Sequence, residues 1–234
     1  MNFFRESFSF VDLTQELSAK IPSWNSGCGF HSEVILNYTD CETECKFLEQ
    51  RLEMVAGIGT HMDAPSHCIP NGDSIDKIPL EKLIVPCIVI NISSKTTEKY
   101  IVSLLDVTNF ENEHGEIPEG AFVIFYTGWD IFWNEPDRYR NHLQFPTISK
   151  KVAEYLLTKD IVGIGIDTLS PDGPESGYPV HQLILGAGKY IVENVANANK
   201  LPPIGSYSLV MPIKTLNGSE APIRLVGLIN LNKS

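Results

Sequence analysis

The hydrophobic residues of this chain fall mostly into short continuous runs that are rich in valine and isoleucine. Short apolar runs bounded by turn residues are typical of strands. The pattern predicts strands over five segments, which are 84–92, 121–127, 161–167, 208–213 and 224–231. We therefore expect a fold that is built on a substantial sheet.

One segment has the periodicity of a helix instead. Four of its apolar residues fall at positions i, i+4, i+7 and i+8, and these are Ile148, Val152, Tyr155 and Leu156. Thr147 precedes them as a candidate N-cap. The helix leads directly into the strand predicted at 161–167, and the strands outnumber the helices without a strict βαβα alternation. This order predicts a mixed α/β fold that is rich in sheet.

The length and composition of the chain predict one soluble domain. The sequence has 234 residues, of which 43% are hydrophobic and 20% charged, and no repeat or low-complexity linker divides it. We expect a single domain over residues 1–234. The net charge is -11, and no run of Lys or Arg could follow a phosphate backbone. Because nucleic-acid binding depends on clustered cations, we do not expect a nucleic-acid partner.

The sequence also predicts a cytoplasmic location without membrane association. No apolar segment approaches the roughly 18 residues that are needed to span a bilayer, and no signal-peptide pattern begins the chain. The five cysteines are odd in number and few for the length. Such usage is typical of reduced thiols and not of a disulfide framework.

Segment 57–67 carries the candidate chemistry, and it reads Gly-Ile-Gly-Thr-His-Met-Asp-Ala-Pro-Ser-His. In extended backbone, His61 and Asp63 would face the same side, because residues two apart do so. An imidazole and a carboxylate together suit a borderline divalent ion such as zinc or manganese. Gly59 leaves that side open, and the proline lets His67 turn back toward it. The alternative is a hydrogen-bonded His/Asp pair in the core.

This segment resembles the signature of the bacterial kynurenine formamidases and related cyclase-family hydrolases, H-x-G-T-H-x-D-x-P-x-H. Every specified position matches except the first, where this chain has Gly57. The resemblance continues downstream in Thr-Gly-Trp at 127–129, in Ile-Asp-Thr-x-Ser at 166–170, and in His181 followed by Glu193. It covers most of the chain, and it implies the swivelling β/β/α fold of that family.

The resemblance implies a set of metal ligands. His61 and Asp63 would bind one metal ion, to which Gly57 cannot contribute. His181 and Glu193 would serve a second ion, so one or two divalent ions are expected per chain, with zinc ahead of manganese. From the residues alone, His181 would be interpreted as a histidine at the start of a helix. Glu193 stands among apolar residues, where an unpaired carboxylate is costly to bury.

Further roles follow from the same resemblance. His67 would be the proton donor and acceptor, and Trp24 would contact the substrate. A divalent ion lowers the pKa of a bound water to roughly 7, which makes hydrolysis of an amide possible at neutral pH. Asp167 ends an apolar strand, where it would either order the ligands or cap a turn.

Residues outside the signature could complete the metal site or hold subunits together. The candidates to fill the position left by Gly57 are water and a residue from elsewhere in the chain, such as His31 or Gln50. The resemblance implies a homodimer or homotetramer. Apolar residues near the N-terminus offer a surface that a monomer would have to hide, and these are Phe3, Phe4, Phe8 and Phe10.

Three functions remain open at this point. The first is a metal-dependent hydrolase of amide-like bonds, with N-formylkynurenine as a candidate substrate. The second is a lactam or lactone hydrolase of the isatin-hydrolase kind. The third is a non-catalytic binding protein that keeps the fold without the imidazole at Gly57.

Overall fold

The computed structural model describes residues 6–25, 27 and 29–231. Eight strands form one mixed sheet, and they are β1 (Phe8–Asp12), β4 (His61–Asp63), β5 (Ile84–Asn91), β7 (Phe122–Tyr126), β9 (Gly163–Ile166), β10 (Tyr190–Glu193), β11 (Ser206–Pro212) and β12 (Glu220–Asn230). Their order in the sheet is β1-β12-β11-β5-β7-β9-β10-β4, and β4 also pairs with β12. This last pairing closes seven strands into a barrel and leaves β1 outside the ring.

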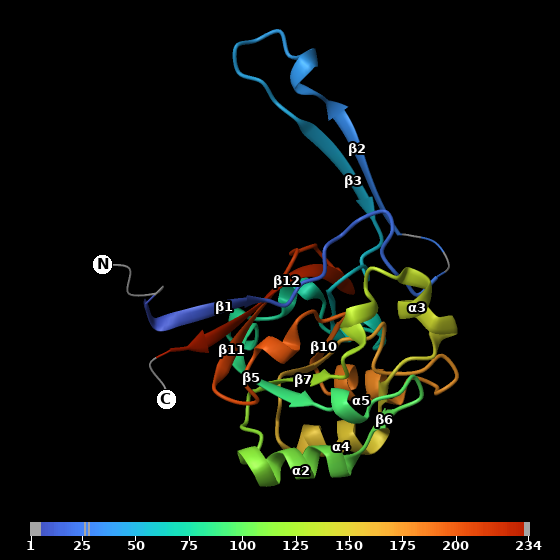
Figure 1. Ribbon diagram of the computed structural model, residues 1–234, viewed down its shortest axis with the longest axis vertical. Coiled ribbons are helices and arrows are strands. Elements are labelled where there is room, and N and C mark those ends of the chain that lie inside the picture. The colour runs from blue at the N-terminus through green and yellow to red at the C-terminus, as the bar shows by residue number, and fades with distance from the viewer. Residues whose placement is uncertain (1–5, 26, 28, 232–234) are drawn as a thin grey trace.

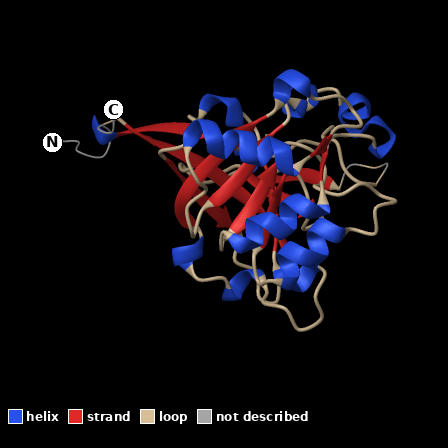
Figure 2. Ribbon diagram, turned by 90° about the horizontal axis from the view of Figure 1, so that it is seen from below, coloured by secondary structure: helices blue, strands red, loops and turns tan. Residues whose placement is uncertain are grey.

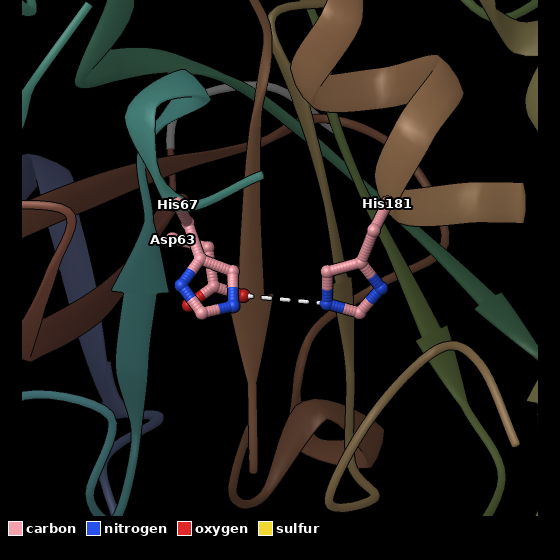
Figure 3. A group of neighbouring side chains, drawn as sticks. All are labelled: Asp63, His67 and His181. Atoms are coloured by element: carbon pink, nitrogen blue, oxygen red, sulfur yellow. Dashed lines mark ion pairs between the residues drawn. The ribbon is translucent and has the colours of Figure 1, made fainter. Parts of the chain in front are cut away.

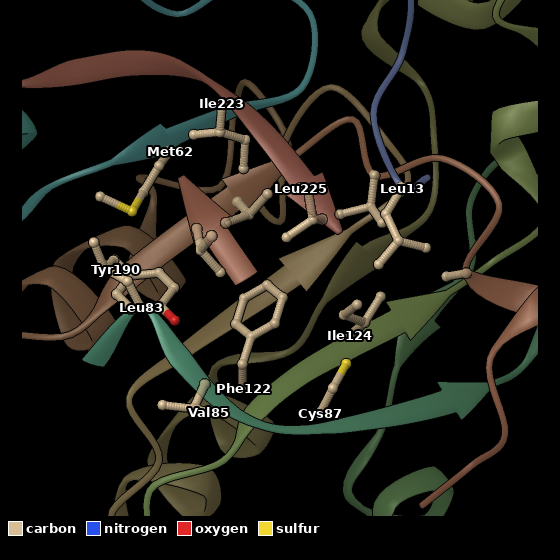
Figure 4. Packing of buried hydrophobic residues seen from close by; sticks show 14 of the residues in the cluster. Leu13, Met62, Leu83, Val85, Cys87, Phe122, Ile124, Tyr190, Ile223 and Leu225 are labelled. Carbon is tan, nitrogen blue, oxygen red and sulfur yellow. The ribbon is translucent and has the colours of Figure 1, made fainter. Parts of the chain in front are cut away.

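The five predicted strands are confirmed as β5, β7, β9, β11 and β12. β5, β7 and β9 run parallel to one another, and all five residues of β7 are buried. Phe122 and Ile124 pack inside the barrel (Figure 4), while Val123 and Phe125 pack in a second core on its outer side. Because both faces of these strands are covered, their sequences are continuously apolar and do not alternate.

Helices cover the outer side of the parallel strands. They are α2 (Leu104–His114), α4 (Lys150–Thr158) and α5 (Pro179–Gly186), while α3 (Pro136–Arg140) packs against the turn after β7, where Trp129 donates to the carbonyl oxygen of Tyr139. Figure 2 shows the strands at the centre of the molecule with helices around them. The prediction of a mixed, sheet-rich α/β fold is confirmed. Within the described part of the chain, no helix combines the length and the apolar character that crossing a membrane requires.

The predicted helix at 148–156 is α4, but its start differs from the prediction. Its N-cap is Ser149, so the interpretation of Thr147 as the cap was wrong. Thr147 and Ile148 form the short strand β8 (Thr147–Ile148), which pairs with β6 (Ile101–Val102). Ile148 is buried in the same core as Val152, and the apolar spacing therefore continues across the boundary between strand and helix.

A two-stranded hairpin extends from the body of the molecule (Figure 1). It consists of β2 (Phe30–Leu36) and β3 (Glu49–Met54), and we call residues 30–55 the arm. Large apolar side chains are exposed along it, namely Val34, Ile35, Tyr38, Phe47, Leu48, Leu52 and Val55. Of the aromatic residues expected to hold subunits together, Phe3 and Phe4 lie outside the described residues. Phe8 and Phe10 lie on β1, which pairs with β12.

Candidate metal centre

Three neighbouring strands bring acidic and imidazole side chains to one place. β4 carries His61 and Asp63, and both are buried. On one side β4 pairs with β10, where Glu193 lies opposite His61. On the other side it pairs with β12, where Glu220 lies opposite Asp63. Since directly opposed residues of paired strands are close neighbours, closure of the barrel places all four side chains together.

The ring of His61 is oriented from behind. Its Nδ1 lies 2.9 Å from the carbonyl oxygen of Gly59, which can only accept, so Nδ1 carries a proton and donates. Its Nε2 then faces Asp63 Oδ1 and Glu193 Oε2, at 3.4 Å from each. Gly59 has a φ of +59°, and a Cβ there would collide with Leu17. The backbone conformation therefore requires a glycine here. A side chain at this position would meet Leu17 and not the ion, which differs from the expectation that Gly59 keeps the metal-binding face open.

His181 enters the same place from the third position of α5. Its Nδ1 lies 2.8 Å from Asp172 Oδ2, and the same carboxylate accepts the backbone N–H of His181 at 2.9 Å. Its Nε2 faces Glu193 Oε1 at 3.5 Å and Asp63 Oδ2 at 3.8 Å. A carboxylate behind a histidine fixes the ring and raises the basicity of the inward nitrogen, as in many metal sites.

The spacing of these atoms fits a divalent ion. Four ligands at about 2.1 Å from a tetrahedral zinc ion are about 3.4 Å apart, which is close to the distances around His61 and Glu193. Asp63 Oδ1 is buried and, among the described residues, receives no hydrogen bond. A buried carboxylate oxygen without a donor is costly unless a cation binds it.

His67 follows β4 in a single 3-10 turn (Pro65–His67). In Figure 3 the rings of His67 and His181 point toward one another beside the carboxylate of Asp63. One ligand atom from each of the three residues lies within 4.8 Å of the others. About one third of the His67 side chain is exposed, and its Nδ1 lies 3.4 Å from Glu220 Oε2. His67 thus stands at the rim, between the buried cluster and the solvent.

The pKa shifts in the cluster reflect its opposed charges. Burial alone would raise the pKa of Glu193, but hydrogen bonds with His181 and His61 outweigh it and hold that pKa low. Burial alone would lower the pKa of His181, but Asp172 and Glu193 raise it to about 11. The hydrogen bond with Glu220 raises the pKa of His67. The carboxylates therefore favour cations at this place, and a metal ion would displace the protons from the inward Nε2 atoms of His61 and His181 on binding.

A cavity of about 500 Å³ opens above the cluster. Trp24, Leu169 and Tyr178 contribute apolar surface to its lining, which also includes His61, His67 and Glu193. The ring of Trp24 lies 6.3 Å from those of Tyr178 and Phe145, and Arg140 donates to its carbonyl oxygen. Aromatic walls beside a group of polar side chains are typical of a site for a small, flat molecule.

The family signature is matched over a long part of the chain. Residues 11–173 match the sequence model of the family named Cyclase. The chain belongs to the Cyclase family. The resemblance seen in the segment 57–67 is thereby confirmed, and relatives named isatin hydrolase and kynurenine formamidase support the expectation of a metal-dependent hydrolase of amide-like bonds.

Relatives in the Cyclase family include two enzymes with different names. The chain is 32% identical to an isatin hydrolase from Roseibium aggregatum over 73% of this chain and 71% of the relative. It is 27% identical to a kynurenine formamidase from Geobacillus thermodenitrificans over 92% of this chain and 95% of the relative.

Solved structures resemble the fold closely. An isatin hydrolase bound to the product analogue thioisatinate has a TM-score of 0.89 and 26% identity, over 98% of this chain and 95% of that one. Isatin hydrolase A from Ralstonia solanacearum has a TM-score of 0.88 and 28% identity, over 98% and 95%. The prediction of the cyclase-family fold is confirmed.

The position left by Gly57 is taken by a residue that the sequence analysis did not name. His31 and Gln50 both lie on the arm and are exposed, so neither fills that position. A Cβ built on Gly57 would overlap Glu220 Oε1 and would lie 3.4 Å from His61 Nε2. A carboxylate therefore stands where a side chain at position 57 would begin.

Two other supporting residues were also missed. Asp172 stands nine residues before His181, and an acidic residue ahead of a predicted helix start is a signal that could have indicated a cap. Asn194 donates from Nδ2 to the carbonyl oxygen of Gly59 and accepts from the hydroxyl of Tyr139. Nothing local to its sequence indicates this bridge.

Asp167 adopts one of the two roles expected of it. Its carboxylate is fully buried and accepts hydrogen bonds from the backbone N–H groups of Thr127, Gly128 and Trp129. It therefore caps the turn after β7. That turn places Trp129 in the core that also contains Trp24.

Proposed function

We propose that the protein opens a carbon–nitrogen bond next to an aromatic ring, with a divalent metal held by His61, Asp63, His181 and Glu193. The observation that carries this proposal is the convergence of two inward Nε2 atoms on the carboxylates of Asp63 and Glu193, where the buried Asp63 Oδ1 receives no hydrogen bond from the described residues. Zinc suits this mixture of nitrogen and oxygen ligands, and manganese is the alternative. We propose one or two such ions per chain.

A divalent ion at this place would supply a water molecule of lowered pKa and would polarise the substrate carbonyl. The residues of the chain supply the rest. His67 stands at the rim, where it can take a proton from the attacking water and pass it to the nitrogen as the carbon–nitrogen bond breaks. Trp24 and Tyr178 would hold the aromatic part of the substrate against the cavity wall.

A thiol nucleophile is not part of this mechanism. Cys68 follows His67 and also lines the cavity. Burial raises the pKa of its thiol, which therefore stays protonated at neutral pH. A protonated thiol is a poor nucleophile, so we assign proton transfer to His67 without a Cys/His pair.

Isatin-like lactams are the substrate class that we favour. The 32% identity to an isatin hydrolase and the TM-scores of 0.88 and 0.89 to solved isatin hydrolases support this choice. N-formylkynurenine is the second candidate, supported by the kynurenine formamidase that aligns over 92% of this chain. Both substrates carry a carbonyl on a nitrogen that is attached to a benzene ring, which suits the aromatic lining of the cavity.

We also propose that the protein is a cytoplasmic homodimer or homotetramer. The four described cysteines are free thiols, which suits a reducing compartment. The exposed apolar residues of the arm suit burial against a second copy of the chain.

The test combines metal analysis with two substrates. We expect the purified protein to contain about one or more divalent ions per chain, zinc ahead of manganese, and to open isatin faster than it cleaves N-formylkynurenine. A chelator should abolish both reactions, and added zinc or manganese should restore them. A metal content well below one per chain that neither ion restores would contradict the metal site. Faster cleavage of N-formylkynurenine would replace the lactam by the formamide as the substrate.

A further inference from the structure

Gly57 is the position at which the chain departs from the family signature, and Glu220 faces it. Glu220 is the first residue of β12 and lies directly opposite Asp63 on β4. Its Oε1 occupies the space that a Cβ at position 57 would need. The two residues are far apart in sequence, so only the closure of the barrel between β4 and β12 brings them together.

Glu220 also belongs to the metal cluster by distance. One ligand atom each from His61, Asp63 and Glu220 lies within 4.8 Å of the others. A Cβ built on Gly57 would lie 2.1 Å from Glu220 Oε1 and 3.4 Å from His61 Nε2, so both side chains border the space at position 57. Glu220 Oε1 thus occupies a position from which it could reach an ion bound by His61 and Asp63.

We propose that Glu220 supplies, through Oε1, the metal ligand that the signature takes from a histidine at position 57. This inference rests on the proposed metal-dependent function and adds a ligand to its site. Its second oxygen has a separate contact, because Oε2 lies 3.4 Å from His67 Nδ1. One carboxylate therefore both completes the ligand set and holds the proton-transferring histidine beside it.

Replacing an imidazole by a carboxylate changes which ions the site prefers. The set then contains the carboxylates of Asp63, Glu193 and Glu220 against the imidazoles of His61 and His181. Carboxylates favour harder ions such as manganese, while imidazole suits zinc. Relative to a site with a histidine at position 57, the affinity of this site should be shifted toward manganese.

Four proteins test the inference through metal binding. They are the wild type, Glu220→Gln, Gly57→His and the double variant Gly57→His/Glu220→Gly. The binding of zinc and of manganese to metal-stripped protein is measured by calorimetric titration at one pH. The absorption spectrum of the cobalt-loaded protein reports the ligand set directly. Glu53→Gln, an exposed change on the arm, is the matched control.

We expect Glu220→Gln to bind manganese at least about 10-fold more weakly than the wild type. Gly57→His alone should not improve binding, since the carboxylate occupies the space of the new side chain. The double variant frees that space, so it should recover affinity, bind zinc in greater preference over manganese, and shift the cobalt spectrum. Thermal unfolding of each variant shows whether it is folded, and the double variant tests the idea even if Glu220→Gln is unstable.

Two results would overturn the role of Glu220 while leaving the proposed metal-dependent function intact. One is unchanged metal affinity and an unchanged cobalt spectrum in Glu220→Gln, beside a wild type that binds metal and is active. The other is a gain in affinity for Gly57→His as large as for the double variant. If the wild type itself binds neither ion, the metal function and the role of Glu220 fail together. The wild-type titration therefore distinguishes the two failures.

Discussion

The three histidines of the site differ in what holds each ring. Behind His61 the acceptor is the carbonyl oxygen of Gly59, and behind His181 it is the carboxylate of Asp172. Both rings are therefore fixed with Nε2 inward, as metal ligands require. The Nδ1 of His67 faces Glu220 instead, and part of its ring is exposed. This contact with the solvent suits a group that must exchange protons during each turnover.

The first prediction separates His67 from the metal ligands. His67→Ala should keep its metal content near that of the wild type and lose about 10²–10⁴-fold in kcat, the usual effect of losing a positioned proton carrier. His61→Ala should lose metal and activity together, because it removes a buried inward nitrogen. Elemental analysis and steady-state kinetics on the same preparations measure both effects.

His31→Ala is the control for this comparison, since His31 is exposed on the arm. It should change neither the metal content nor kcat. His67 can also approach the ion, because it groups with Asp63 and His181 within 4.8 Å. If His67→Ala strips the metal as completely as His61→Ala does, then His67 is a ligand and its assignment as the proton carrier is wrong.

At the scale of single elements, the start of α2 shows how one acidic residue stabilises a helix. Asp106 is 5% exposed, and its Oδ2 accepts hydrogen bonds from the backbone N–H and the hydroxyl of Ser103. Tyr100 donates its hydroxyl to the same carboxylate, and Lys95 forms an ion pair with it. This reciprocal arrangement of N-cap and third helical residue resembles a capping box, and here it also ties α2 to the segment before it.

The second prediction concerns the stability that this cap provides. Asp106→Ala should lower the free energy of unfolding by about 2 kcal/mol at pH 7, because it removes a cap and leaves buried donors unpaired. Burial alone would raise the pKa of Asp106, but Lys95 and Ser103 outweigh it and lower that pKa. A lowered pKa in the folded state means that the contribution is complete above the unfolded pKa, about 3.9, and is lost as the pH falls through the folded value.

Urea denaturation at pH 7 and at acidic pH measures this effect. The difference between wild type and Asp106→Ala should be largest at neutral pH and should shrink below about pH 4. Glu119→Ala, which changes an exposed acidic residue outside α2, should have little effect at either pH. A difference that grows on acidification would contradict the ionised cap.

At the scale of the whole molecule, the arm extends from the body and leaves large apolar side chains exposed. An isolated two-stranded hairpin is marginally stable in water, and this one exposes large apolar side chains. Val34 and Leu52 lie on the same face, because Leu52 is paired with Ser32, two residues before Val34. A second copy of the chain that covers this face would both stabilise the arm and hide its apolar surface.

The third prediction is that this face holds the proposed homo-oligomer together. The wild type should have a mass of at least two chains by light scattering at micromolar concentration. Val34→Glu/Leu52→Glu should reduce it to one chain of 26.1 kDa, because burying two carboxylates in an apolar interface is costly. His31→Gln/Glu53→Gln, on the opposite face of the same strands, should leave the mass unchanged. A wild type that is already monomeric would contradict the oligomer.

The sequence by itself determined the features that depend on residues close together in the chain. The continuous apolar runs predicted β5, β7 and β9, because strands covered on both faces need no polar alternation. The spacing of His61 and Asp63 predicted a shared face, since side chains two apart on a strand point the same way. The signature around them indicated the family without any knowledge of the fold.

Only the tertiary structure decided which distant groups complete the site. Glu220 meets Gly57 because β12 pairs with β4 and closes the barrel, and no local periodicity encodes that pairing. Asp172 meets the ring of His181 because the loop between them folds back over the start of α5. The helix α4 begins after Ser149 because Ile148, the residue before it, pairs with Val102 in a short parallel strand. The physical reason is common to all three, since contacts between distant segments are selected by packing and pairing of the whole chain and not by the properties of neighbouring residues.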